Sequence, residues 1–167
     1  TDLVECCAIY TGPSWNDVQQ SLVMVTTTGQ ADDGVMTGVR ISDASGSGYV
    51  TFIGVDAGPT LYWFDGVGGF TQLATIDITI SNGQTFEIRA ADDGGGGDVR
   101  IRVFVAGVQR IDYPYTLNRA RSGDPGFGGF GDIADTTMTT WTGTGEVAAG
   151  GRTTRNKRRK PTRRRCG

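Results

Sequence analysis

Side chains that could carry out catalysis are few in this sequence of 167 residues. Histidine is absent, so neither a Ser/His nor a Cys/His pair can form. Glycoside hydrolysis needs two carboxylates that face each other across a cleft, and each of the glutamates, Glu5, Glu87 and Glu146, stands alone in the sequence. We therefore predict that the protein is not an enzyme.

A cluster of aspartates could gather oxygen ligands around a calcium ion. Asp92 and Asp93 precede a run of glycines, and Asp98 follows it. Calcium binds about six to eight oxygens, and the spacing of these carboxylates matches no established calcium loop. Two interpretations stay open, a Ca²⁺ site formed by Asp92, Asp93 and Asp98 or a solvated acidic turn. We expect no other cofactor.

Aromatic side chains could form a surface on which a sugar ring stacks. Trp15 lies in a polar loop, and Tyr62, Trp63 and Phe64 follow one another in an apolar segment. In a strand, neighbouring side chains point to opposite faces, so at least one face of this aromatic segment must be buried. These residues are therefore either core and subunit contacts or a glycan-binding platform.

Basic residues are concentrated at the C-terminal end. Residues 1–151 carry 18 acidic and seven basic residues, a net charge of −11, and no acidic residue follows them. The nine remaining basic residues are Arg152, Arg155, Lys157, Arg158, Arg159, Lys160, Arg163, Arg164 and Arg165. Such a tail would bind the phosphates of nucleic acid without sequence preference. An acidic protein surface, such as that of a neighbouring copy, and a merely solubilising end are the alternatives.

The elements that must position these residues have the pattern of β-strands. Apolar and polar residues alternate in most segments, as in residues 99–105, where every second side chain would point to the same face. Glycine-rich turns separate about ten or eleven segments of this kind at nearly regular spacing. The pattern predicts an all-β protein folded as an antiparallel β-sandwich of the jelly-roll type.

The sandwich is expected to fill residues 1–146. Its central unit, residues 85–131, contains a two-residue reversal at Ala106-Gly107, which requires a positive φ at Gly107. Residues 147–167 are a Gly/Ala linker followed by the Arg/Lys-rich tail. Because this tail has almost no apolar residue to pack, we expect it to be disordered or extended.

Several strand-and-turn motifs follow one another in a familiar order. They are Tyr49-Val50-Thr51-Phe52, Leu61-Tyr62-Trp63-Phe64-Asp65-Gly66, Gly69-Phe70-Thr71-Gln72-Leu73, Gln84-Thr85-Phe86-Glu87-Ile88-Arg89-Ala90, Val103-Phe104-Val105-Ala106-Gly107-Val108 and Ser122-Gly123-Asp124-Pro125-Gly126-Phe127-Gly128. Over residues 8–145 this succession resembles the concanavalin-A-like, or laminin-G-like, jelly rolls of bacteriophage structural proteins and secreted bacterial proteins. The resemblance implies a fold more strongly than a function.

Two functions are consistent with the resemblance and the basic tail. The main hypothesis is a structural or decorating protein of a bacteriophage particle, located in the virion and contacting other virion proteins or copies of itself. The family usually has a further strand ahead of Leu3, so we expect a neighbouring subunit to cover that edge. The alternative is a secreted, extracellular carbohydrate-binding module that contacts surface glycans. We expect no membrane partner, because no apolar run approaches the ~20 residues that span a bilayer.

Overall fold

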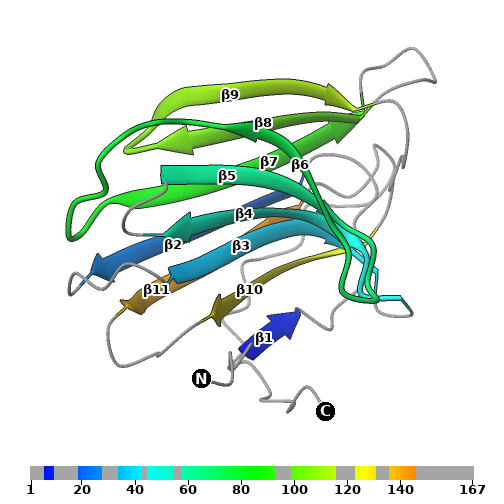
Figure 1. Ribbon diagram of the computed structural model, residues 1–167, viewed down its shortest axis with the longest axis horizontal. Helices are drawn as coiled ribbons and strands as arrows, with labels where there is room; N and C mark the ends of the chain where they lie inside the picture. Colours follow the sequence, from blue (N-terminus) through cyan, green and yellow to red (C-terminus); the bar gives the residue numbers. More distant parts are fainter. Residues whose placement is uncertain are drawn as a thin grey trace, which may run out of the picture.

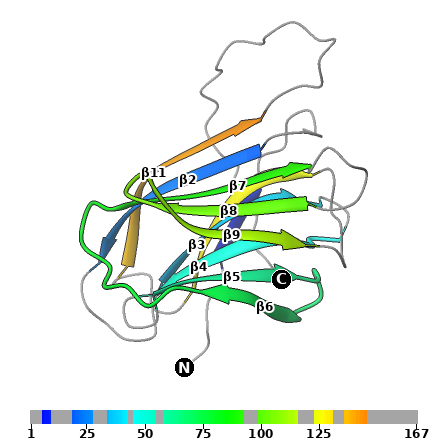
Figure 2. The ribbon, with the colours of Figure 1, turned by 90° about the horizontal axis from the view of Figure 1, so that it is seen from above.

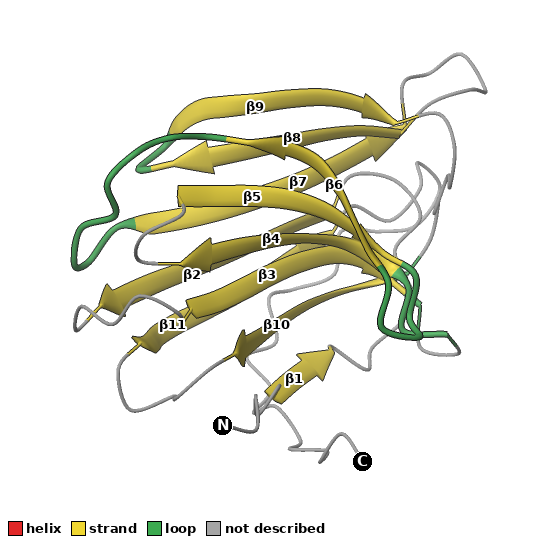
Figure 3. Cartoon of the chain, in the orientation of Figure 1, coloured by secondary structure: helices red, strands yellow, loops and turns green. Residues whose placement is uncertain are grey.

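The structure, a computed structural model, describes residues 6–9, 19–27, 34–42, 45–54, 58–92, 99–115, 123–130 and 136–145. Strands and loops make up these residues (Figure 3), and none of them belongs to a helix able to cross a membrane. The strands are β1 (Cys6–Ile9), β2 (Gln19–Thr27), β3 (Gly34–Ile41), β4 (Gly48–Gly54), β5 (Gly58–Phe64), β6 (Phe70–Thr75), β7 (Thr85–Asp92), β8 (Val99–Val105), β9 (Val108–Tyr115), β10 (Asp124–Phe130) and β11 (Thr136–Gly145). The linker and the basic tail, residues 147–167, lie outside the described residues.

Two antiparallel sheets form the molecule (Figures 1 and 2). The six-stranded sheet has the order β1-β10-β3-β4-β5-β6, and the five-stranded sheet has the order β11-β2-β7-β8-β9. Seen from above in Figure 2, β7, β8 and β9 lie over β3, β4 and β5, so the sheets are stacked as two layers. The predicted all-β antiparallel sandwich is confirmed.

Alternation of side chains explains why these segments form strands with one buried face. In β8, Val99, Ile101, Val103 and Val105 are buried and the residues between them are partly exposed. Val, Ile and aromatic residues suit a pleated, half-buried surface. The buried side chains of both sheets meet between the layers in two clusters. One joins Tyr49, Leu61 and Trp63 to Ile88, Ile101, Val103, Ile111 and Tyr115, and the other joins Val35 and Ile53 to Phe86 and Val105.

The chain's later strands return to the strands at its beginning. β10 inserts between β1 and β3 in the six-stranded sheet, and β11 pairs with β2 in the five-stranded sheet. The sequence predicts residues 85–131 as one unit, but the structure divides them, because β7 to β9 belong to one sheet and β10 belongs to the other. Short hairpins connect β7 to β9, whereas β10 is reached by a crossover between the layers.

A β-bulge places an arginine in an unusual conformation near the end of β3. Ile41 pairs with Asp124 and Gly38 with Gly126, so β3 has one residue more than β10 between these pairs. Arg40 lies in this bulge with a φ of 54°, in the left-handed region, and it is fully buried. A side chain on Gly123 would place its Cβ 2.5 Å from the carbonyl carbon of Arg40, so only glycine fits beside the bulge.

The reversal between β8 and β9 has the predicted geometry. Gly107 has a φ of 78°, which confirms the prediction, and Ala106 also has a positive φ, of 50°. Two consecutive residues with positive φ define a type I′ turn, whose twist matches that of the strands it joins.

Candidate functional site

Four aromatic side chains gather on the outer face of the six-stranded sheet. Tyr49, Thr51, Leu61 and Trp63 point from β4 and β5 into the core, so the residues that alternate with them point outward. The outward set consists of Phe52 on β4, Tyr62 and Phe64 on β5, and Phe70 on β6. We call these four residues the aromatic platform.

Strand register brings the rings of the platform into contact. Phe64 pairs with Phe70 across β5 and β6, and their rings stack with centroids 4.6 Å apart. The ring centroid of Phe52 lies 5.0 Å from that of Tyr62 and 4.9 Å from that of Phe70, and the centroids of Tyr62 and Phe70 are 5.9 Å apart. Contacts at these distances hold aromatic side chains in fixed orientations. The platform is therefore preorganised, although Phe70 keeps 36 % of its surface exposed.

A tight loop between β5 and β6 forms one rim of the platform. The carboxylate of Asp65 accepts hydrogen bonds through Oδ1 from the backbone N–H groups of Val67, at 2.9 Å, and Gly69, at 2.8 Å. These two N–H donors lower the pKa of Asp65, because they stabilise its charged form. Val67 is 90 % exposed at the tip of the loop.

A second loop, between β3 and β4, contacts the first. Gly66 has a φ of 85°, and a Cβ on it would lie 1.7 Å from the carbonyl oxygen of Ser45. The hydroxyls of Ser45 and Ser47 are 2.7 Å apart and exposed. The rim therefore presents hydroxyls and a carboxylate beside an apolar surface, which is a suitable combination for binding a molecule with one apolar face and several hydroxyls.

The structure brings together only part of the predicted aromatic site. Tyr62 and Phe64 lie in the platform, whereas Trp63 points into the core with 8 % of its surface exposed and cannot stack on a ligand. Trp15 lies outside the described residues. The sequence prediction missed Phe52 and Phe70, which lie on the two strands that flank β5. Phe52 is two residues from Val50 and Phe70 is two residues from Gln72, and both Val50 and Gln72 pair with Tyr62. This spacing is the signal that the aromatic residues share a face.

The predicted calcium site is only partly described. Asp92 ends β7, and its Oδ1 accepts a hydrogen bond from the buried guanidinium of Arg40 at 2.7 Å. A cation is therefore already in contact with this carboxylate, and it would repel a calcium ion. Asp93 and Asp98 lie outside the described residues, and the described part of the chain contains no group of three potential metal ligands.

The predicted anion-binding tail is outside the described residues as well. This applies to all nine basic side chains from Arg152 to Arg165. Nucleic acid and an acidic protein surface stay predicted partners of that segment.

Known proteins resemble this chain in structure and not in sequence. No protein-family model matches the sequence, and no curated protein matches it at a significant level. The carbohydrate-binding module CBM66 from Bacillus subtilis superposes with a TM-score of 0.61 at 12 % identity, over 84 % of this chain and 81 % of that one. The carbohydrate recognition domain of Emp47p gives 0.55 at 14 % identity, over 84 % and 76 % of the two chains. Sheep galectin-11 gives 0.52 at 10 % identity, over 83 % and 96 %. The chain thus has the concanavalin-A-like β-sandwich fold.

Proposed function

We propose that this protein is a carbohydrate-binding module that holds a glycan on the aromatic platform. The observation that carries the proposal is the cluster of Phe52, Tyr62, Phe64 and Phe70, which three neighbouring strands present on one outer face with their rings in mutual contact. Three proteins of the same fold, whose names identify them as a carbohydrate-binding module, a carbohydrate recognition domain and a galectin, support it.

The chemistry of a sugar ring fits this surface. One face of a pyranose presents C–H groups and packs on aromatic rings, while hydroxyls project from its edge and need hydrogen-bond partners. The exposed side chain of Gln72, which pairs with Tyr62 across the strands, can both donate and accept. Asp65 and Ser45 supply acceptors and a hydroxyl at the rim.

We infer binding without catalysis. Among the described residues of the platform and its two rim loops, Asp65 is the one carboxylate, whereas glycoside hydrolysis uses two on opposite sides of the scissile bond. The chain also lacks histidine, so no imidazole could act as a base. An extracellular location fits a protein that binds surface glycans.

The bacteriophage hypothesis rests on the sequence resemblance and on the basic tail, and it stays a prediction. A virion protein would assemble with itself or with other virion proteins, whereas a binding module would bind its glycan as a monomer or small oligomer. Sedimentation of the purified chain, with and without a polysaccharide, separates the two hypotheses.

Substitutions on the platform test the proposal. The wild-type chain is screened on a glycan array, and the affinity for the strongest glycan is then measured by calorimetry for Phe70→Ala and Tyr62→Ala. We expect each substitution to weaken binding by about tenfold, because a stacking surface is lost. The matched control is Val108→Ala, which removes an exposed apolar side chain from β9 in the other sheet.

Two results would contradict the proposal. One is a wild-type chain that binds no glycan above background. The other is an equal loss of affinity in Val108→Ala and Phe70→Ala, which would show that the platform is not the site.

A further inference from the structure

The outer face of the five-stranded sheet concentrates positive charge. On β7 the buried residues Phe86, Ile88 and Ala90 alternate with outward Glu87 and Arg89, and on β8 the outward residues are Arg100, Arg102 and Phe104. Asp112 joins them from β9. Residues 1–151 have a net charge of −11 and contain seven arginines and no lysine. Four of these arginines lie on adjacent strands here, since Arg110 of β9 joins Arg89, Arg100 and Arg102. We call Glu87, Arg89, Arg100, Arg102 and Asp112 the arginine face.

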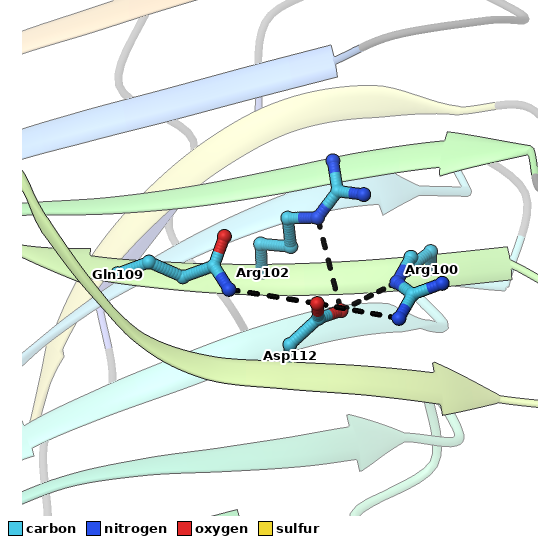
Figure 4. Close-up of polar contacts among 4 residues, drawn as sticks. All are labelled: Arg100, Arg102, Gln109 and Asp112. Atoms are coloured by element: carbon cyan, nitrogen blue, oxygen red, sulfur yellow. Dashed lines mark hydrogen bonds and ion pairs between the residues drawn. The ribbon is translucent and has the colours of Figure 1, made fainter.

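Asp112 accepts two hydrogen bonds from one of the arginines. Arg100 binds both of its carboxylate oxygens, through Nε to Oδ1 at 2.5 Å and through Nη2 to Oδ2 at 3.3 Å (Figure 4). This contact, more than any other, lowers the pKa of Asp112. Gln109 adds a hydrogen bond to Oδ2 at 3.5 Å. Both carboxylate oxygens of Asp112 therefore already accept hydrogen bonds from residues other than Arg102.

The positive charge of Arg102 is only weakly compensated by a neighbouring carboxylate. Its Nε lies 3.7 Å from Oδ1 of Asp112, which is an ion pair without a hydrogen bond, and the structure gives its guanidinium no hydrogen bond to any described residue. Figure 4 shows its two terminal nitrogens pointing away from Asp112. A guanidinium has five N–H donors, and 40 % of this side chain is exposed, so its donors are available to a ligand.

Arg89 stands directly opposite Arg102. The two residues are register partners on β7 and β8, and like charges at opposed positions destabilise a sheet. Arg89 is held in place by Glu87, which accepts hydrogen bonds from its Nε and from Nη2, and by the ring of Phe104, 4.1 Å from its Cζ. The two arginines therefore project from neighbouring positions on one face, and an anion bound there would offset the repulsion between their charges.

We propose that the arginine face binds the carboxylate of an acidic sugar, such as a uronic acid residue in a polysaccharide. Arg102 provides the principal contact and Arg89 the second. A carboxylate is planar and has two oxygens, which match the fork of a guanidinium. A single negative charge also suits a surface within residues 1–151, whose net charge of −11 would repel the dense charge of a nucleic acid or a polyphosphate.

This inference does not depend on the glycan site proposed above. The arginine face and the aromatic platform belong to different sheets and share no residue. Either proposal can therefore fail while the other holds. If both hold, the chain would bind an acidic polysaccharide on one face and a neutral glycan on the other, and would link these two molecules.

Calorimetry with two polysaccharides tests the site. The probes are polygalacturonate and its methyl ester, which differ in the charge of the carboxyl groups. We expect the full chain to bind polygalacturonate and not the ester, and Arg102→Gln to bind it about tenfold more weakly, because a charge-assisted hydrogen bond is lost. The matched control is Arg165→Gln, which removes one of the nine basic residues of the tail and changes the net charge equally. Arg165→Gln should leave the affinity within about twofold of wild type.

A variant that is expected to bind more tightly distinguishes loss of the site from misfolding, because a misfolded protein would bind more weakly. Asp112→Asn removes the competing carboxylate, so we expect it to bind polygalacturonate more tightly by about threefold to tenfold. Asp77→Asn, which changes an exposed aspartate between β6 and β7 and alters net charge equally, should change the affinity little. Equal effects of Arg102→Gln and Arg165→Gln, or equal binding of the ester, would each overturn the assignment.

Discussion

The buried guanidinium of Arg40 donates a hydrogen bond from Nη1 to Oδ1 of Asp92 at 2.7 Å, and this contact joins β3 in one sheet to β7 in the other. The rest of the interface between the sheets is largely apolar, so this ion pair is a directional contact between two layers that otherwise pack by shape. Arg40 reaches Asp92 from a bulge, where its backbone has positive φ.

The first prediction follows from that ion pair. Asp92→Asn should lower the free energy of unfolding by about 1–3 kcal/mol, since the charged partner of a buried guanidinium is lost while 37 % of the Asp92 side chain remains in contact with water. Urea denaturation measures the change. The matched control is Asp77→Asn at an exposed position, and equal stability of the two variants would contradict the structural role of Asp92.

The second prediction concerns the turn between β8 and β9. Ala106 has a φ of 50°, which costs an alanine about 1 kcal/mol, and asparagine tolerates this conformation better. Ala106→Asn should therefore raise the melting temperature. Gly107→Ala should lower the stability by about 1 kcal/mol through its backbone alone, because no atom lies within 4 Å of the added Cβ. Thermal unfolding by circular dichroism shows both signs, and a stability unchanged in Gly107→Ala would mean that the turn has another conformation in solution.

The third prediction concerns the rim of the aromatic platform. In Gly66→Ala the new Cβ would meet the carbonyl oxygen of Ser45 at 1.7 Å, so the two rim loops must separate. We expect a loss of more than about 2 kcal/mol in stability, together with weaker glycan binding. Gly83→Ala is the control, because Gly83 also has a positive φ but has open space around it. Denaturation and calorimetry on both variants separate the steric effect from the backbone effect.

The fourth prediction is a pH dependence. The backbone N–H groups of Val67 and Gly69 depress the pKa of Asp65 in the folded protein. A depressed pKa stabilises the fold at pH values above the unfolded pKa of aspartate, about 3.9, and this stabilisation is lost as the pH falls through the folded value. Wild type should therefore be more stable than Asp65→Asn at pH 7, and the difference should disappear in acid. Denaturation at a series of pH values gives the curve, and a difference that grows in acid would contradict the assignment.

Much of the fold could be predicted from the sequence because it depends on local pattern. Alternating apolar residues in β8 predicted a strand, and Ala106-Gly107 predicted the tight turn that follows it. The crossover of β10 to the other sheet could not be predicted in the same way. Strand alternation specifies which side chains share a face, and it leaves open which distant strand becomes the neighbour.

The candidate site was predictable only in part for the same reason. Alternation separates Trp63 from Tyr62 and Phe64, but it does not say which of the two faces is the core. Phe52 and Phe70 join the platform through pairing between strands, which a single segment does not encode. Arg40 is buried because a bulge rotates it out of the strand pattern, and no residue type in the sequence marks that bulge.

Pairing of the first strands with the last has a consequence for folding kinetics. Cys6 faces Gly129 in β1 and β10, and Gln19 faces Gly145 in β2 and β11, so neither sheet is complete until almost the whole sandwich has left the ribosome. The hairpins from β3 to β6 and from β7 to β9 close short loops and can form early, while the pairs that join the two ends of the sandwich must wait for a long and entropically unfavourable loop to close. Folding is therefore expected to be slow, on the order of milliseconds to seconds. During that interval the edges of β2 and β3 are left open to other chains.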